Sequence, residues 1–136
     1  DALSAQLREL RGFNLLQGKE RLLADSLGIG ASGFVVSLIH IDPYPFVALY
    51  RAVRSGQMET ARRLQAEINK VIGLVEECLA RRPETSTLFH FLNWTLTHRQ
   101  LCANILLEHE GECPQWLADK ARSAVEICAA ARMIQE

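Results

Sequence analysis

Lysine is scarce in this sequence. Of the fifteen basic residues in the 136-residue chain only three are lysines, Lys19, Lys70 and Lys120, so chemistry that needs a lysine amine has few candidates. Sixteen acidic residues bring the net charge to −1, and neither sign is gathered into a block. This lack of a basic patch argues against a nucleic-acid partner.

A long apolar run is also missing. The longest stretch without Asp, Glu, Lys or Arg extends from Ser26 to Ile41 and is too short to span a bilayer. The first residues combine neither a basic leader nor a continuous apolar core, so we expect no secretory signal. Most of the four cysteines fall inside helical patterns, where they act as small apolar residues: Cys78, Cys102, Cys113 and Cys128. We therefore expect reduced thiols in a cytoplasmic protein without a membrane span.

The first third of the chain alternates helix and strand. The pattern predicts helices over 1–11 and 20–27 and strands over 13–17 and 33–39. The second strand is almost continuously apolar, as a strand covered on both faces must be. Short loops between these elements predict a parallel α/β arrangement, because strands joined through a helix run the same way.

Two parallel strands do not make a stable sheet by themselves. Such a pair has two open edges and two apolar faces, whereas parallel sheets occur almost entirely within larger sheets covered by helices. The sequence therefore implies further strands. Either a preceding part of the natural polypeptide or another chain supplies them.

Beyond Pro43 the pattern is helical throughout. The spacing predicts helices over 45–55 and 58–82, a third from Thr85 toward Gly111, and a fourth that begins at Pro114. The last helix carries a narrow, alanine-rich stripe suited to close packing: Leu117, Ala121, Ala124, Val125, Cys128 and Ala131.

An ordered set of short segments resembles the dihydrodipicolinate synthase/N-acetylneuraminate lyase family. The segments are 14–20 (Asn-Leu-Leu-Gln-Gly-Lys-Glu), 27–28 (Leu-Gly) and 30–37 (Gly-Ala-Ser-Gly-Phe-Val-Val-Ser). Downstream, three more follow the family's order of helix, turn and helix: 42–43 (Asp-Pro), 49–52 (Leu-Tyr-Arg-Ala) and 56–61 (Gly-Gln-Met-Glu-Thr-Ala). The resemblance is close over residues 1–75 and extends to 85–136 only in general helical character.

The resemblance implies an α/β fold. Residues 1–55 are expected to form the C-terminal part of a TIM (β/α)8 barrel, containing strands seven and eight. Residues 56–136 are expected to form a C-terminal helical domain, a bundle. Family members are commonly tetramers built as pairs of dimers, so a homo-oligomer is expected as well.

The resemblance also implies a class I aldolase. In the family a lysine on the sixth strand forms a Schiff base with pyruvate or a related 2-oxo acid, which then reacts with an aldehyde. That lysine, a proton-relaying tyrosine and a substrate-binding threonine pair belong to strands upstream of this chain. We therefore expect no catalytic residue, cofactor or metal in these 136 residues.

Three residues are expected to line the substrate pocket. By position Gly18 and Val35 match the family's passive pocket-lining residues, and His40 follows the last strand, where barrel enzymes carry function. For His40 the alternative is a hydrogen bond to neighbouring loops. His40 stands where the family usually has Asn, and Ser32 where it often has Asp. The family's Arg-x-Pro segment has no clear counterpart near 110–114, and these departures bear on the particular substrate.

Other candidate sites have simpler interpretations. Lys19 follows a strand and is a conceivable replacement amine, but a lysine in such a loop is usually a solvated charge. His98 with Cys102, and His109 with Cys113, provide two metal ligands each without convergent partners, so structural roles are favoured.

Two further functional hypotheses stay open beside the lyase. One is a non-catalytic helical interaction or oligomerisation module derived from the family. The other is an independent helical bundle, in which residues 13–39 form a loop and a buried helix.

Overall fold

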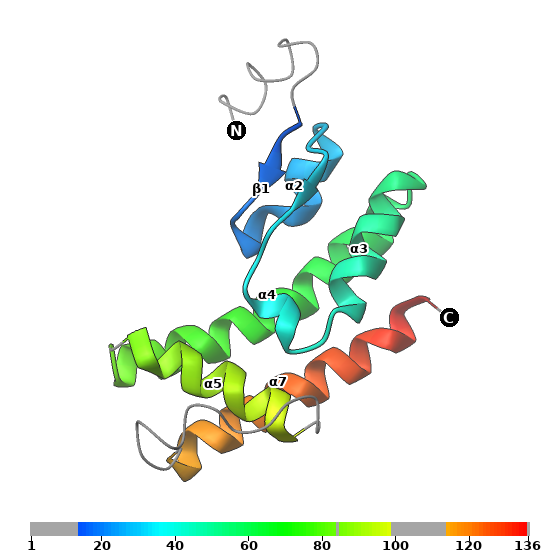
Figure 1. Cartoon of the computed structure of the whole chain (residues 1–136). Coiled ribbons are helices and arrows are strands. Elements are labelled where there is room, and N and C mark those ends of the chain that lie inside the picture. The colour runs from blue at the N-terminus through cyan, green and yellow to red at the C-terminus, as the bar shows by residue number, and fades with distance from the viewer. Residues whose placement is uncertain (1–13, 84, 99–113, 136) are drawn as a thin grey trace.

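The described part of the chain is mostly helical and carries one small parallel sheet (Figure 1). A computed structural model describes residues 14–83, 85–98 and 114–135. The helix predicted over 1–11 lies outside these ranges. The sheet and α2 (Leu23–Gly28) lie at one end of the molecule, and α5 (Thr85–His98) lies at the other.

The sheet is a single parallel pair. Strand β1 (Leu16–Gln17) pairs with β2 (Gly33–Phe34), with Leu16 opposite Gly33. The ladder is extended at both ends by Ser32 N–H donating to Leu15 O (2.8 Å) and Val35 N–H donating to Gln17 O (3.0 Å). The 3-10 helix η1 (Glu20–Leu22) and α2 connect the strands, so the predicted strand–helix–strand unit is confirmed. This pairing argues against the hypothesis that residues 13–39 form only a loop and a buried helix.

The strands are shorter than the sequence pattern predicts. The prediction of a strand over 33–39 is wrong beyond Phe34, because residues Leu38–His40 form a 3-10 helix, η2. An apolar run favours a strand only where a neighbouring backbone continues the ladder. Here the last cross-strand bond reaches Val35, and the chain then turns. In the described part of the predicted strand 13–17, β1 likewise contains only two residues.

The helices after Pro43 agree with the sequence pattern. Helix α3 covers Tyr44–Arg54 and α4 covers Met58–Arg81, separated by a turn in which Gly56 has a φ of +78°. That conformation is readily adopted by glycine, which explains the helix stop. Helices α5 and α7 (Gln115–Ala130) begin beside Thr85 and Pro114 as predicted, and a 3-10 helix, η3, covers Ala131–Gln135.

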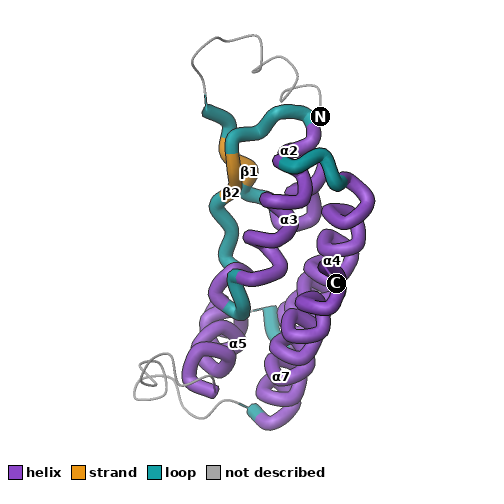
Figure 2. Tube along the Cα trace, turned by 90° about the vertical axis from the view of Figure 1, so that its right-hand side faces the viewer, coloured by secondary structure: helices purple, strands orange, loops and turns teal. Residues whose placement is uncertain are grey.

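Helix α4 is the central packing element. It contacts α2 and α3 on the side of the sheet and α5 and α7 at the other end, and Figure 2 shows α4 and α7 side by side. Its buried face repeats at helical spacing: Ala61, Leu64, Gln65, Ile68, Val71, Ile72, Val75 and Cys78. The small residues of α7 allow the close approach, since Ala121 and Ala124 are fully buried. Cys78 and Cys128 are also buried, as expected of small apolar residues.

A polar clamp ties the end of the chain to the start of α3. Asp42 accepts a hydrogen bond from Tyr44 N–H (2.9 Å), one of the N–H groups that the first turn of a helix leaves without a helical partner. Its other carboxylate oxygen lies 3.0 Å from the guanidinium of Arg132, which also stacks over the Tyr44 ring at 5.2 Å. The Asp42 side chain is only 6% exposed, so this clamp excludes most of the solvent.

Asp42→Ala is expected to lower the free energy of unfolding by about 1–2 kcal/mol, since a capping acceptor is lost. Asp42→Asn keeps the oxygen that accepts from Tyr44 and should cost less. Arg132→Ala, at a side chain that is 53% exposed, should cost less than about 1 kcal/mol. Urea unfolding measures all three, and an equal loss for Asn and Ala at position 42 would contradict the capping role.

Candidate functional site at the sheet edge

The two faces of the sheet differ in what they contact. On one face Gln17 donates from Nε2 to Ser26 Oγ of α2 (2.5 Å), and the Phe34 ring lies 6.4 Å from the rings of both Phe46 and Tyr50 of α3. Because side chains alternate along a strand, residues 16, 18, 33 and 35 point to the opposite face. The helices therefore cover one face of the sheet.

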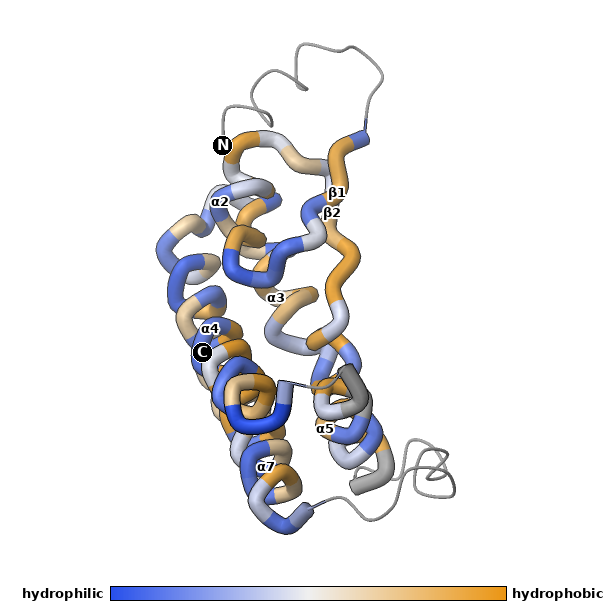
Figure 3. Tube along the Cα trace, turned by 90° about the vertical axis from the view of Figure 1, so that its left-hand side faces the viewer, coloured by the Kyte–Doolittle hydropathy of each residue, from blue (hydrophilic) through white to orange (hydrophobic). Residues whose placement is uncertain are grey.

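The opposite face is apolar and exposed. Leu16 is 54% exposed and Val35 is 70% exposed, the two highest values among the large hydrophobic residues of the sheet region. Figure 3 shows hydrophobic residues along β1, β2 and the segment that follows. An exposed apolar face is unusual for a parallel sheet, because such sheets are normally covered on both faces.

Gly18 and Val35 lie together at the carboxyl end of this sheet. Gly18 follows β1 directly, and a Cβ built on it would come 3.9 Å from Val35 O, which is an ordinary contact. Packing against the described neighbours therefore does not require glycine at this position. The structure brings the two predicted pocket residues to one edge, while their contact with a substrate stays a prediction.

His40 is not at a strand end, because it belongs to η2, which follows the last cross-strand bond and contacts α5. It occupies the last position of η2 and is exposed, and its Nδ1 lies 2.8 Å from Ser37 O. This bond lies within its own turn, so a hydrogen bond from His40 to a neighbouring loop stays a prediction. The assignment of His40 to the pocket stays a prediction.

The two loops at the carboxyl end of the sheet are held to each other by side chains. Glu20 accepts a hydrogen bond from Ser37 N–H through Oε1 (3.1 Å), which joins η1 to the turn before η2. Gln17 Oε1 accepts from Lys19 N–H (2.9 Å), which fixes the loop between β1 and η1. The sequence carries no specific signal for Glu20, because a glutamate in the first turn of a helix is common.

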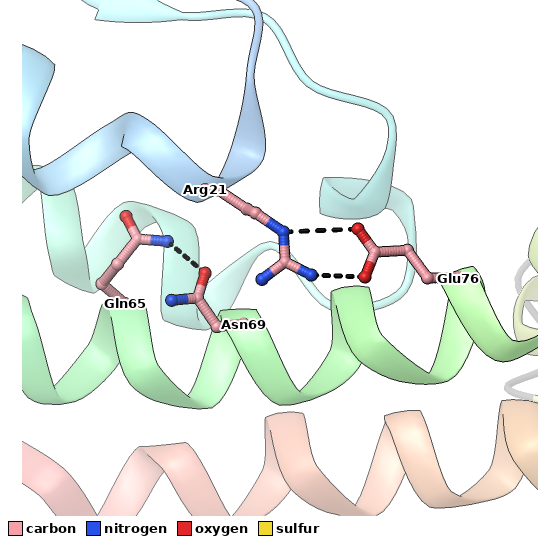
Figure 4. A network of polar contacts seen from close by, with 4 residues as sticks. All are labelled: Arg21, Gln65, Asn69 and Glu76. Carbon is pink, nitrogen blue, oxygen red and sulfur yellow. Dashed lines mark hydrogen bonds and ion pairs between the residues drawn. The ribbon is translucent and has the colours of Figure 1, made fainter.

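A buried glutamine on α4 forms hydrogen bonds with η1 and α2, and Figure 4 shows it beside Asn69. Gln65 is 9% exposed, accepts from Ala24 N–H through Oε1 (3.0 Å) and donates from Nε2 to Glu20 O (2.9 Å) and Asn69 Oδ1 (3.1 Å). Arg21 of η1 also pairs with Glu76, which lies farther along α4, through both carboxylate oxygens. The signal for Gln65 in the sequence is a single polar residue on the otherwise apolar buried stripe of α4.

None of the three lysines is buried. Lys19 is exposed after β1, and Lys70 forms an ion pair with Glu67 (2.7 Å) within α4. The hydrogen bond from Lys120 to Glu77 raises the pKa of Lys120 above its ordinary value, which stabilises the protonated amine. A Schiff-base lysine needs the opposite setting, a desolvated amine with a lowered pKa.

The metal-site alternatives are mostly outside the described residues. Cys102, His109 and Cys113 lie outside, and the His98 side chain is not described either. Within residues 14–83, 85–98 and 114–135, no group of three or more His, Cys, Asp or Glu side chains is placed to hold a metal ion. No helix in these ranges is both long and apolar enough to cross a membrane.

The chain is similar to known lyases over part of its length. A model of the dihydrodipicolinate synthetase family matches residues 4–102. A DapA-like lyase of Thermoplasma acidophilum, itself uncharacterised, is 41% identical over 66 residues, which are 48% of this chain and 22% of the relative.

N-acetylneuraminate lyases are similar over segments of comparable length. That of an Enterobacter species is 39% identical over 61 residues, or 45% of this chain and 20% of the relative. That of Escherichia coli is 34% identical over 68 residues, or 50% of this chain and 23% of the relative. The matched segments thus span about a fifth of the length of these relatives.

Proposed function

The chain belongs to the dihydrodipicolinate synthetase family, and from this premise we propose that it is the C-terminal part of a Schiff-base-forming, pyruvate-dependent lyase. The observation that carries the proposal is the one-sided sheet. Helices cover the face with Gln17 and Phe34, while Leu16 and Val35 stay exposed on the other.

The exposed face is the inner face of a (β/α)8 barrel in this proposal. The parallel β1 and β2 are its seventh and eighth strands, and the remaining strands belong to the longer protein. Side chains from all strands fill the interior of such a barrel, and the active site lies at the carboxyl ends of the strands. Gly18 and Val35 are at this end of β1 and β2, where Gly18 permits close approach of a bound 2-oxo acid and the branched Val35 side chain limits the space beside it.

The catalytic lysine lies upstream of this chain. Its amine attacks the carbonyl carbon of a 2-oxo acid, and water leaves. In the bond-forming direction the pyruvate Schiff base loses a methyl proton to give an enamine, which adds to an aldehyde. In the bond-breaking direction the Schiff base of a longer 2-oxo acid releases the aldehyde and leaves that enamine. The settings of Lys19, Lys70 and Lys120 support this assignment, because all three are at least partly exposed and two pair with glutamates. The protein acts in the cytoplasm as a homo-oligomer, a dimer or tetramer, without a metal or organic cofactor.

Borohydride reduction in the presence of pyruvate tests the proposal. The full-length protein is expected to gain the mass of one reduced pyruvate adduct per chain, mapped by peptide mass spectrometry to an upstream lysine. This chain alone is expected to gain none, and Lys19→Ala in the full-length protein should trap as well as the parent does. An adduct on any of the three lysines of this chain would contradict the assignment.

The same experiment distinguishes the alternative of a non-catalytic interaction or oligomerisation module. The observation that favours this alternative is that α4, α5 and α7 pack around a shared apolar core, and that no lysine belongs to this core in the described residues. A full-length protein that self-associates but traps no pyruvate would support the module and exclude the lyase.

A further inference from the structure

We propose that Gln65 and Glu20 are positioning residues. Through them the central helix α4 fixes the position of the turn 37–40 and of His40. The proposal rests on the proposed function only in treating this turn as part of the pocket mouth. The contacts themselves form a continuous series of hydrogen bonds across three elements that are distant in sequence.

The first step joins α4 to η1. Gln65 binds both ends of the helical turn from Glu20 to Ala24. Its Nε2 donates to Glu20 O, and its Oε1 accepts from Ala24 N–H. The donor and acceptor of one planar amide have a fixed geometry, so η1 cannot rotate on α4 without breaking one of these bonds. The amide is almost fully buried, where a broken bond has no water to replace it.

The second step joins η1 to the turn after β2. The Glu20 side chain reaches across the loops, and its Oε1 accepts from Ser37 N–H at 3.1 Å. The last cross-strand hydrogen bond is donated by Val35 N–H, so Ser37 N–H does not bond to β1. A carboxylate acceptor makes a stronger bond to a backbone N–H than a neutral acceptor does. Glu20 therefore holds the segment after β2 in place beyond the end of the strand ladder.

The third step joins the turn to the imidazole of His40. Ser37 O lies 2.8 Å from His40 Nδ1 and also accepts from His40 N–H at 3.3 Å. A carbonyl oxygen only accepts, so Nδ1 carries the proton in this bond. In the neutral ring Nε2 is then the basic nitrogen. Ser37 thus donates its N–H to Glu20 and accepts from His40 through its carbonyl oxygen. We call this series of contacts from Gln65 to His40 the relay, and it sets both the orientation and the tautomer of the imidazole ring.

Hydrogen exchange and nitrogen NMR on the full-length protein test the relay. In Glu20→Ala the Ser37 amide is expected to exchange about three to tenfold faster, which corresponds to one lost hydrogen bond. The Nδ1-protonated fraction of neutral His40 should fall in the 15N spectrum. Glu20→Gln keeps an acceptor oxygen and should restore both signals. Glu76→Ala is the matched control, because Glu76 is an exposed carboxylate on α4 that pairs with Arg21 of η1 and is not a member of the relay.

Gln65→Leu tests the first step at a distance. It removes no atom that touches Ser37, yet it should accelerate Ser37 exchange, and the double variant with Glu20→Ala should exchange no faster than Glu20→Ala alone. If Gln65→Leu fails to fold, Gln65→Glu provides the same test, because it keeps the oxygen and loses the donor to Glu20 O. Unchanged Ser37 exchange in a folded Glu20→Ala variant would overturn the proposal.

Kinetics separate positioning from a general structural role. In an active protein Glu20→Ala should raise the KM for the aldehyde-side substrate and leave the rate of pyruvate trapping unchanged, with Glu20→Gln close to the parent. Equal loss in Glu20→Ala and Glu20→Gln would contradict positioning. If no pyruvate is trapped while the exchange pattern holds, the proposed function fails and the relay stands.

Discussion

Phe46→Ala is expected to lower the free energy of unfolding by about 3–5 kcal/mol, the range for a large aromatic side chain removed from a core. Phe46 is 1% exposed and stands where α3, α4 and α7 meet. It contacts the Phe34 ring of β2 and lines an apolar hollow with Ile68, Val71 and Cys128. These neighbours come from different elements and cannot all close around an alanine, so a cavity remains.

Urea unfolding followed by far-ultraviolet circular dichroism measures this loss. Val47→Ala is the matched control on the same helix, since Val47 is 38% exposed and its truncation should change the free energy of unfolding by less than about 1 kcal/mol. Losses of equal size at positions 46 and 47 would contradict the role of Phe46 as a core residue.

Leu16→Asp is expected to be tolerated in this chain alone and to destabilise the full-length protein. In this chain alone Leu16 is 54% exposed, so the aspartate stays solvated and the free energy of unfolding should change by less than about 1 kcal/mol. In the full-length protein the same position faces the barrel interior under our proposal. There an unpaired carboxylate should cost more than about 3 kcal/mol, enough to prevent folding or to force a strongly raised pKa.

Soluble yield and urea unfolding of both proteins check this contrast. Val47→Asp serves as the control for a new carboxylate, because it lies on the solvent side of α3 and should be tolerated in both contexts. A full-length protein that tolerates Leu16→Asp as well as Val47→Asp would exclude the closed barrel, since a position inside a packed barrel does not accept a lone charge.

Part of the candidate site was accessible from the sequence. The strand–helix–strand order places Gly18 and Val35 at the same edge, because the carboxyl ends of parallel strands coincide. The contributions of Glu20 and Gln65 were not accessible. Gln65 bonds to residues 41 and 45 positions away, and Glu20 to one 17 positions away, and no local spacing rule encodes such pairs.

The sequence by itself determined the helices and the family. Apolar residues repeat at helical spacing over α3, α4 and α7, and the turn at Gly56 and the prolines mark their ends, because these signals act within a few residues along the chain. Only the tertiary structure decided where β2 stops, which sheet face stays exposed and how Gln65 reaches Glu20. Strand length and buried polar contacts depend on partners that are distant in sequence, and such partners meet only when the chain folds.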